Sequence, residues 1–444
     1  MIVTRQSDTD TEKRIPARRG WLALSPVIVF LLLYVAVSII IGDFYKMPIA
    51  VALVVASVWA VAIYRKRPLM ERIETFSRAA GHSNILYMIW VFVLAGAFAT
   101  LAKEIGAIDA TVNLTLRFFP PEFVVPTLFF AACFISLSVG TSVGTVVALT
   151  PLAVQIAEMA DANVAFYVAV VLGGAFFGDN LSFISDTTIA ATRSQGCGMA
   201  DKFKANLWIA LPAAIITLAA YIVMGQASPA IAMVGNSNPL LILPYVVVLA
   251  TAIIGINVTI VLSFGILSAL AIGLVDGFSL IEMAGFAGKG IDGMGDLIII
   301  TLLAAGMLGV IKAAGGVQFL LQGLTSRISG RRGAQAILAI LVGIVNLCTA
   351  NNTVAIITVG GISREIAIRY GIDPRKSASL LDSASCVVQC LIPYGAQTLL
   401  ATSLAGISPA SPFPYLYYPW ALALMIALSI IFLFPRRYVS ARRP

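Results

Sequence analysis

Apolar residues along the chain occur in long runs separated by short polar segments. A helix needs about 20 apolar residues to cross a bilayer core about 30 Å thick. Because a helix satisfies its own backbone hydrogen bonds in lipid, the pattern predicts an all-α polytopic membrane protein. We assign full crossings to 22-41, 47-64, 85-102, 163-195, 207-224, 239-255, 258-275, 297-311, 374-404 and 417-435.

The composition agrees with this assignment. Of the 444 residues, 59% are hydrophobic and 11% are charged, whereas soluble domains have about 25% charged residues. The net charge of +8 could indicate a nucleic-acid partner, but the basic residues lie in polar segments between apolar runs. There they act as topology signals, so we expect a lipid bilayer and no nucleic acid. The five cysteines have no metal-ligand spacing, and we expect neither a disulfide nor a cofactor.

The chain also resembles itself. At an offset of 210 positions, Ala95-Gly96 aligns with Ala305-Gly306 and Ala191-Thr192 with Ala401-Thr402, without a gap over more than a hundred residues. This register predicts two copies of one unit. We divide the chain into an N-terminal segment 1-20, a first repeat 21-224, a linker 225-238, a second repeat 239-435 and a tail 436-444.

Five crossings in each copy would invert the second copy, giving two inverted-topology repeats of five transmembrane helices. In this topology 25 of the 29 Lys and Arg residues lie on one side of the membrane, and the exceptions are Lys46, Lys103, Arg117 and Lys289. The segment 276-296 is expected to be an outer loop. The positive-inside rule then places both termini and the tail in the cytoplasm. We expect a multi-pass protein of the cytoplasmic (inner) membrane of a prokaryote. Inverted repeats are typical of secondary transporters.

Each copy has one further apolar stretch, 122-160 and 332-370, which a polar segment divides at its centre. The two polar tips contain Thr141, Ser142, Asn351 and Asn352. The legs are at the short limit for a full crossing, so both a re-entrant hairpin and two complete helices are consistent with the sequence.

The crossing 163-195 is interrupted by GDNLSFISD, which predicts a broken helix. Its counterpart 374-404 keeps the break but places Gln389 opposite Asp179. Backbone carbonyls freed at such breaks are suitable cation ligands. Around the breaks and tips we expect an ion site that uses Asp179, Asn180, Ser182, Asp186, Thr187, Thr141, Ser142, Asn351, Asn352, Gln389 and Asp382.

Asp179, Asp186 and Asp382 are the acidic residues that this topology leaves well inside membrane spans. Intramembrane carboxylates are expensive and usually serve transport. The alternative for Asp186, in its SDTT context, is a cap on the second half-helix. Asp179 has no basic residue near it in the sequence, and we expect it to be the central Na⁺ ligand and, with Asp382, to carry the proton.

The segment GAFFGDNLSFISDTT, the VGTSVGT tip and LLDSASCVVQCLIPYGAQ resemble sodium/proton antiporters of the NhaC type, within the ion transporter superfamily. The resemblance implies a scaffold of the first three helices of each copy and an elevator-like transport unit of hairpins and broken helices. It further implies a homodimer formed through scaffold helices. Members usually have proline where this chain has Phe183, and some relatives carry organic substrates.

The expected activity is exchange of Na⁺ or Li⁺ for H⁺. Burial disfavours the charged form of a carboxylate, so near neutral pH one group can hold either a proton or Na⁺, and competition produces exchange. A cation-coupled carrier of a small organic acid or amino acid is the alternative, and the absence of Lys and Arg at the tips and breaks argues against it. An intramembrane aspartyl protease using Asp179 and Asp382 lacks most of its sequence context, and we expect no enzyme.

Overall fold

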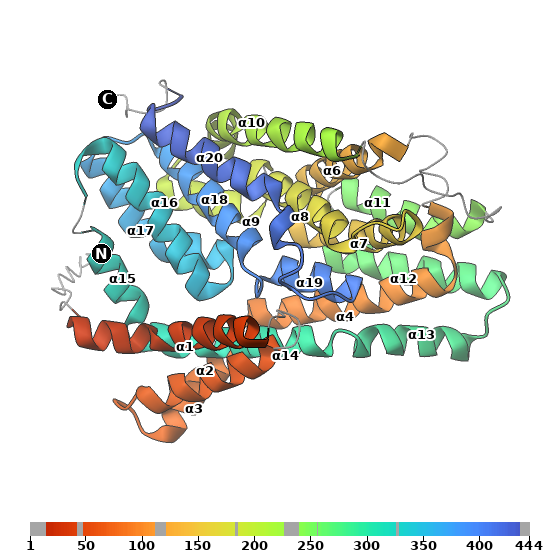
Figure 1. The fold of residues 1–444 in the computed structure, drawn as a ribbon, viewed down its shortest axis with the longest axis horizontal. Coiled ribbons are helices and arrows are strands. Elements are labelled where there is room, and N and C mark those ends of the chain that lie inside the picture. Colours follow the sequence, from red (N-terminus) through yellow and green to blue (C-terminus); the bar gives the residue numbers. More distant parts are fainter. Residues whose placement is uncertain are drawn as a thin grey trace, which may run out of the picture.

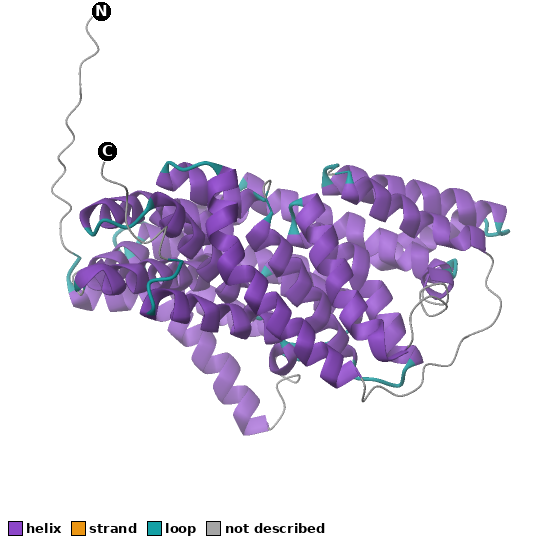
Figure 2. Ribbon diagram, turned by 90° about the horizontal axis from the view of Figure 1, so that it is seen from above, coloured by secondary structure: helices purple, strands orange, loops and turns teal. Residues whose placement is uncertain are grey.

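The computed structural model describes residues 15–41, 48–111, 121–182, 185–225, 239–254, 256–325 and 328–435. Residues 226–238 of the linker 225-238, the tail and Phe183 therefore lie outside the described residues. Within the described ranges the chain is helical and has no strand (Figure 2). Nine of the described helices are long and apolar enough to cross a membrane. The chain is an all-α polytopic membrane protein.

The first half contains α1 (Ala17–Ile41), α2 (Ile49–Ile63), α3 (Leu69–Ala80), α4 (Ser83–Glu104), α6 (Pro121–Val139), α7 (Ser142–Met159), α8 (Val164–Leu181), α9 (Asp186–Gln195) and α10 (Met199–Gly225). The second half contains η1 (Pro239–Ile242), α11 (Leu243–Ile253), α12 (Val258–Val275), α13 (Leu280–Asp292), α14 (Gly295–Ala313), α15 (Gly316–Thr325), α16 (Gly330–Thr349), α17 (Asn352–Arg369), α18 (Pro374–Leu391), α19 (Ala396–Ala405), η2 (Phe413–Tyr415) and α20 (Tyr417–Ile431).

Three helices recur at the offset found in the sequence. The bounds of α7, α8 and α9 each shift by 210 to give those of α17, α18 and α19. The left-handed backbone also recurs, with φ of 72° at Gly140 and 49° at Ala350 in front of α7 and α17. Both broken helices end at a left-handed glycine, Gly196 or Gly406. A similar sequence thus adopts the same local structure in both halves.

These recurrent helices pack crosswise between the halves. In each half the helix leading to the tip packs on the first part of the broken helix, α6 on α8 and α16 on α18. The helix after each tip packs on the second part of the other broken helix, α7 on α19 and α17 on α9. This crosswise packing brings the helix after each tip to the broken helix of the other half. In Figure 1 the helices involved, α6 to α9 and α16 to α19, lie above α4 and α14.

Six further helices form a separate layer. Helices α1 to α4, α13 and α14 lie along the lower side of Figure 1. There α13 crosses α4 at Gly290 and Gly96, and a Cβ on Gly290 would lie 2.1 Å from the carbonyl oxygen of Gly96. Such close backbone approach between helices requires small residues.

The expectation that 276-296 is a loop is wrong. Residues 280–292 form α13, which packs along α4. Its first turn has a capping box, in which the Ser279 side chain accepts from the Glu282 backbone and the Glu282 side chain accepts from Ser279. Glu282 is one of the acidic residues that suggested a loop. In the structure it belongs to a capping box, which stabilises the start of a helix.

Candidate functional site

The break in the first half separates α8 from α9. Gly174 and Gly178 let α8 approach α6 closely, since a Cβ on Gly178 would lie 2.3 Å from the Cβ of Ser136. After Leu181 the chain leaves the helix, and Ser185 starts the next one by accepting a hydrogen bond of 3.2 Å from the Thr188 backbone amide. The cap on α9 is thus Ser185, whereas Asp186, for which we considered that role, is the first helical residue and is exposed.

Asp179 lies at the meeting point of both tips and is only 5% exposed. Its Oδ2 atom accepts hydrogen bonds from Ser142 Oγ at 3.0 Å and from Asn352 Nδ2 at 3.3 Å. Ser142 and Asn352 are the first residues of α7 and α17. Two helix N-termini therefore converge on one carboxylate, and their dipoles stabilise its negative charge.

Two glutamines continue this network into the second break. Gln397 in α19 donates to Ser142 Oγ at 3.0 Å and accepts from Gln389 at 3.0 Å. Gln389 also donates to the carbonyl of Ala350 at the second tip, at 3.0 Å. Side chains from four helices and both halves thus surround Asp179. From the sequence we predicted Gln389 as a site residue but not Gln397, although Gln397 is the last residue of the LLDSASCVVQCLIPYGAQ segment.

A cavity of about 330 Å³ lies beside this network. Its walls include eight of the predicted site residues, Asp179, Asp186, Thr187, Thr141, Ser142, Asn351, Asn352 and Gln389. Its lining also includes Tyr87, Met88 and Val91 of α4 and Ile256, Asn257 and Val258 at the start of α12. Among the described residues that line the cavity, two are acidic and none is basic. Oxygen-bearing side chains and two carboxylates suit a hard cation.

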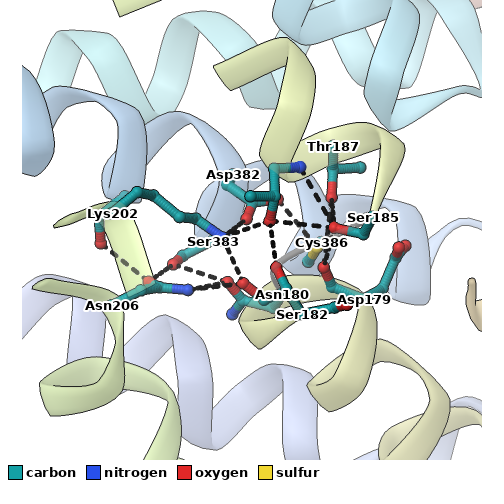
Figure 3. A network of polar contacts seen from close by, with 12 residues as sticks. Asp179, Asn180, Ser182, Ser185, Thr187, Lys202, Asn206, Asp382, Ser383 and Cys386 are labelled. Atoms are coloured by element: carbon teal, nitrogen blue, oxygen red, sulfur yellow. Dashed lines mark hydrogen bonds and ion pairs between the residues drawn. The ribbon is translucent and has the colours of Figure 1, made fainter. Parts of the chain in front are cut away.

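The other three predicted residues have their partners elsewhere. The Asn180 side chain accepts hydrogen bonds from Asn206 and Ser383. Ser182 donates to the carbonyl of Leu137 at 3.1 Å. Asp382 in α18 forms an ion pair with Lys202 of α10, and both side chains are fully buried. Figure 3 shows this second polar cluster next to Asp179.

Lys202 overturns one sequence inference. We expected no Lys or Arg at the breaks, but Lys202 Nζ donates to the carbonyl of Asn180 at 2.5 Å and to Thr188 Oγ1 at 2.8 Å (Figure 3). A cation therefore lies at the first break. An aspartyl protease would need the carboxylates of Asp179 and Asp382 as a dyad, but Asp382 is paired with Lys202.

The carbonyls at the break also have internal partners. Asp179 O accepts from Ser185 Oγ at 2.7 Å, and Ser182 O accepts from Thr188 Oγ1 at 2.8 Å. With the Lys202 bond to Asn180, three carbonyls that we expected to be open cation ligands are engaged. Buried backbone oxygens need such partners, and the hydroxyls of the ISDTT segment supply most of them.

A sequence signal for the second cluster existed but was missed. Lys202 and Asn206 are four residues apart, so they lie on one face of a helix. We began this crossing at residue 207, whereas α10 begins at Met199. If we had started this helix at Met199, Lys202 and Asn206 would have been predicted as polar residues of a membrane helix.

Comparisons with known proteins show the family of the chain. The model of the Na⁺/H⁺ antiporter family matches residues 18–226 and 228–435. The chain is 24% identical to an uncharacterised Na⁺/H⁺ antiporter of Haemophilus influenzae, over 76% of this chain and 79% of the relative.

Two further relatives differ in what their names state. A malate-2H⁺/Na⁺-lactate antiporter of Bacillus subtilis is 22% identical over 94% of this chain and 95% of its own length. The Na⁺/H⁺ antiporter NhaC of Alkalihalophilus pseudofirmus is 23% identical over 74% of this chain and 78% of its own length. Because the family model covers nearly the whole length, the chain belongs to the Na⁺/H⁺ antiporter family.

Proposed function

We propose that the protein exchanges Na⁺ or Li⁺ for H⁺ across the cytoplasmic membrane, with both cations competing for Asp179. The observation that carries this proposal is the cavity with two carboxylates and no basic residue among its described walls. Family membership supports cation/proton exchange, and the relatives are antiporters, not enzymes.

In this proposal Asp179 is the shared ligand. Its charge is balanced by Na⁺ in one state and removed by a proton in the other. Asp186, exposed in the same cavity, attracts the cation and adds a second carboxylate near the site. The hydroxyl and amide oxygens of Ser142, Asn352 and Gln389 replace part of the hydration shell that Na⁺ loses. Asp179 is the proton carrier, since Asp382 is paired with Lys202.

Transport would proceed by alternating access. The crosswise layer of tips and broken helices is the proposed moving unit, and α4 and α12, which also line the cavity, belong to the proposed scaffold. The halves would be inverted repeats with both termini in the cytoplasm, and the tips would be re-entrant hairpins. Scaffold helices would form a homodimer. Reporter fusions after residue 230 would read outside in this topology.

The test uses purified protein in liposomes that enclose a pH-sensitive dye. An inward Na⁺ or Li⁺ gradient is expected to alkalinise the lumen of vesicles that contain the protein, and choline is expected to have no effect. Protein-free vesicles and vesicles with Asp179→Asn are the controls. No Na⁺-driven proton flux in wild type would contradict the proposal.

A second candidate is cation-coupled transport of a small organic acid or amino acid. It is favoured by the relative named as a malate/lactate antiporter and by the two helix N-termini at the cavity, which could hold a carboxylate. The two aspartates in the cavity disfavour an anion. In the same liposomes, radiolabelled malate or lactate uptake that depends on Na⁺ would select this candidate.

A further inference from the structure

The Lys202 ammonium has the surroundings of a bound cation. Its three oxygen partners are the Asp382 carboxylate, the Asn180 carbonyl and the Thr188 hydroxyl. A carboxylate, a backbone carbonyl from an unwound helix and a hydroxyl are also the ligand types that hold Na⁺ in transporters. All of these groups are buried.

The cluster is not needed to build a broken helix. At the offset of 210, Leu172 of α8 corresponds to Asp382, yet the second break has the same bounds as the first without a carboxylate there. Thr398, the counterpart of Thr188, is retained. The fold thus forms the break without an ion pair. A buried ion pair is weak evidence for stability, so the one-sided pair calls for another explanation.

We propose that the Lys202 ammonium is a tethered cation that permanently fills a second cation site, formed by Asp382, Asn180 and Thr188. Asp382 is then neutralised throughout the cycle, and the cargo cation binds only at Asp179. Without the amine, the oxygen ligands would remain and one negative charge would be unbalanced. The emptied site would accept free Na⁺.

The experiment removes the cargo site first, so that its outcome does not depend on the proposed function. Thermal unfolding of purified Asp179→Asn protein is compared in NaCl and in choline chloride at equal ionic strength. Because the cargo ligand is neutralised and Lys202 fills the second site, the two melting temperatures are expected to agree. Asp179→Asn/Lys202→Ala is expected to melt at a clearly higher temperature in NaCl than in choline chloride.

Two controls define the ligands. Adding Asp382→Asn to the double variant is expected to abolish the Na⁺ response, because the remaining ligands are neutral. Methylammonium chloride is expected to stabilise Asp179→Asn/Lys202→Ala as Na⁺ does, since it restores the missing ammonium group.

The proposal is contradicted by a Lys202→Ala variant that shows no Na⁺-dependent stabilisation, or that does not fold in NaCl. A response that persists after Asp382→Asn also contradicts it. Failure of Na⁺/H⁺ exchange in wild-type liposomes would overturn the proposed function and leave this result standing, so the two failures are distinguishable.

Discussion

The side chain of Asn352, the first residue of α17, donates a hydrogen bond of 3.3 Å to the carboxylate of Asp179, 173 residues earlier in the chain. Ser142 binds the same oxygen from α7. One carboxylate thus joins the tips of both halves, and a cation that binds it would affect the contacts of both tips.

The first tip is predicted to stay in contact with the second broken helix during transport. Ser142 and Gln397 lie 3.0 Å apart at their polar atoms. In a cysteine-free background, Ser142→Cys/Gln397→Cys is expected to bind Hg²⁺ and to join the two halves after cleavage at a protease site engineered into the 226–238 segment. The single-cysteine variants are the controls, and two separate fragments in the double variant would refute the contact.

The two neighbours at the start of α9 are predicted to have different roles. Ser185→Ala removes a helix cap, which typically costs about 1 kcal/mol, and a buried bond to Asp179 O. It is expected to lower the melting temperature. Asp186→Asn, at an exposed position, is expected to leave the melting temperature nearly unchanged and to weaken the apparent Na⁺ affinity. Equal effects of both substitutions on melting would argue against this division.

The crossing of α13 and α4 offers a matched pair of substitutions. Gly290→Ala would place its Cβ 2.1 Å from the Gly96 carbonyl oxygen, whereas a Cβ on Gly285 in the same helix meets nothing within 4 Å. Overpacking typically costs about 1–3 kcal/mol, so Gly290→Ala is expected to melt at a lower temperature than Gly285→Ala. Similar melting of both variants would mean that the helices do not cross there.

Exchange is predicted to show simple competition between protons and Na⁺. As pH falls, a larger fraction of Asp179 is protonated, so the KM for Na⁺ is expected to rise while the maximal rate at saturating Na⁺ stays the same. The measurement is initial proton flux against Na⁺ concentration at several pH values. A maximal rate that falls with a constant KM would indicate separate sites.

The sequence was most informative where polar residues interrupt apolar runs. The tips, the breaks and the central position of Asp179 follow from such interruptions and from the expense of an intramembrane charge. Contacts between the halves could not be derived, because Gln397 meets Ser142 only through crosswise packing. The role of Lys202 was missed because the polar start of α10 resembles a loop in the sequence. Helix α13 was missed because its charged residues also suggested a loop.

The most direct test of the central claim is proton flux as a function of Na⁺ concentration in liposomes containing Asp179→Asn. We expect this variant to fold, because Asn keeps the size of the side chain, and to show neither Na⁺ binding nor proton exchange. Asp186→Asn in parallel liposomes is expected to retain exchange with a higher KM. Wild-type rate and Na⁺ affinity in Asp179→Asn would show that this carboxylate is not the shared site.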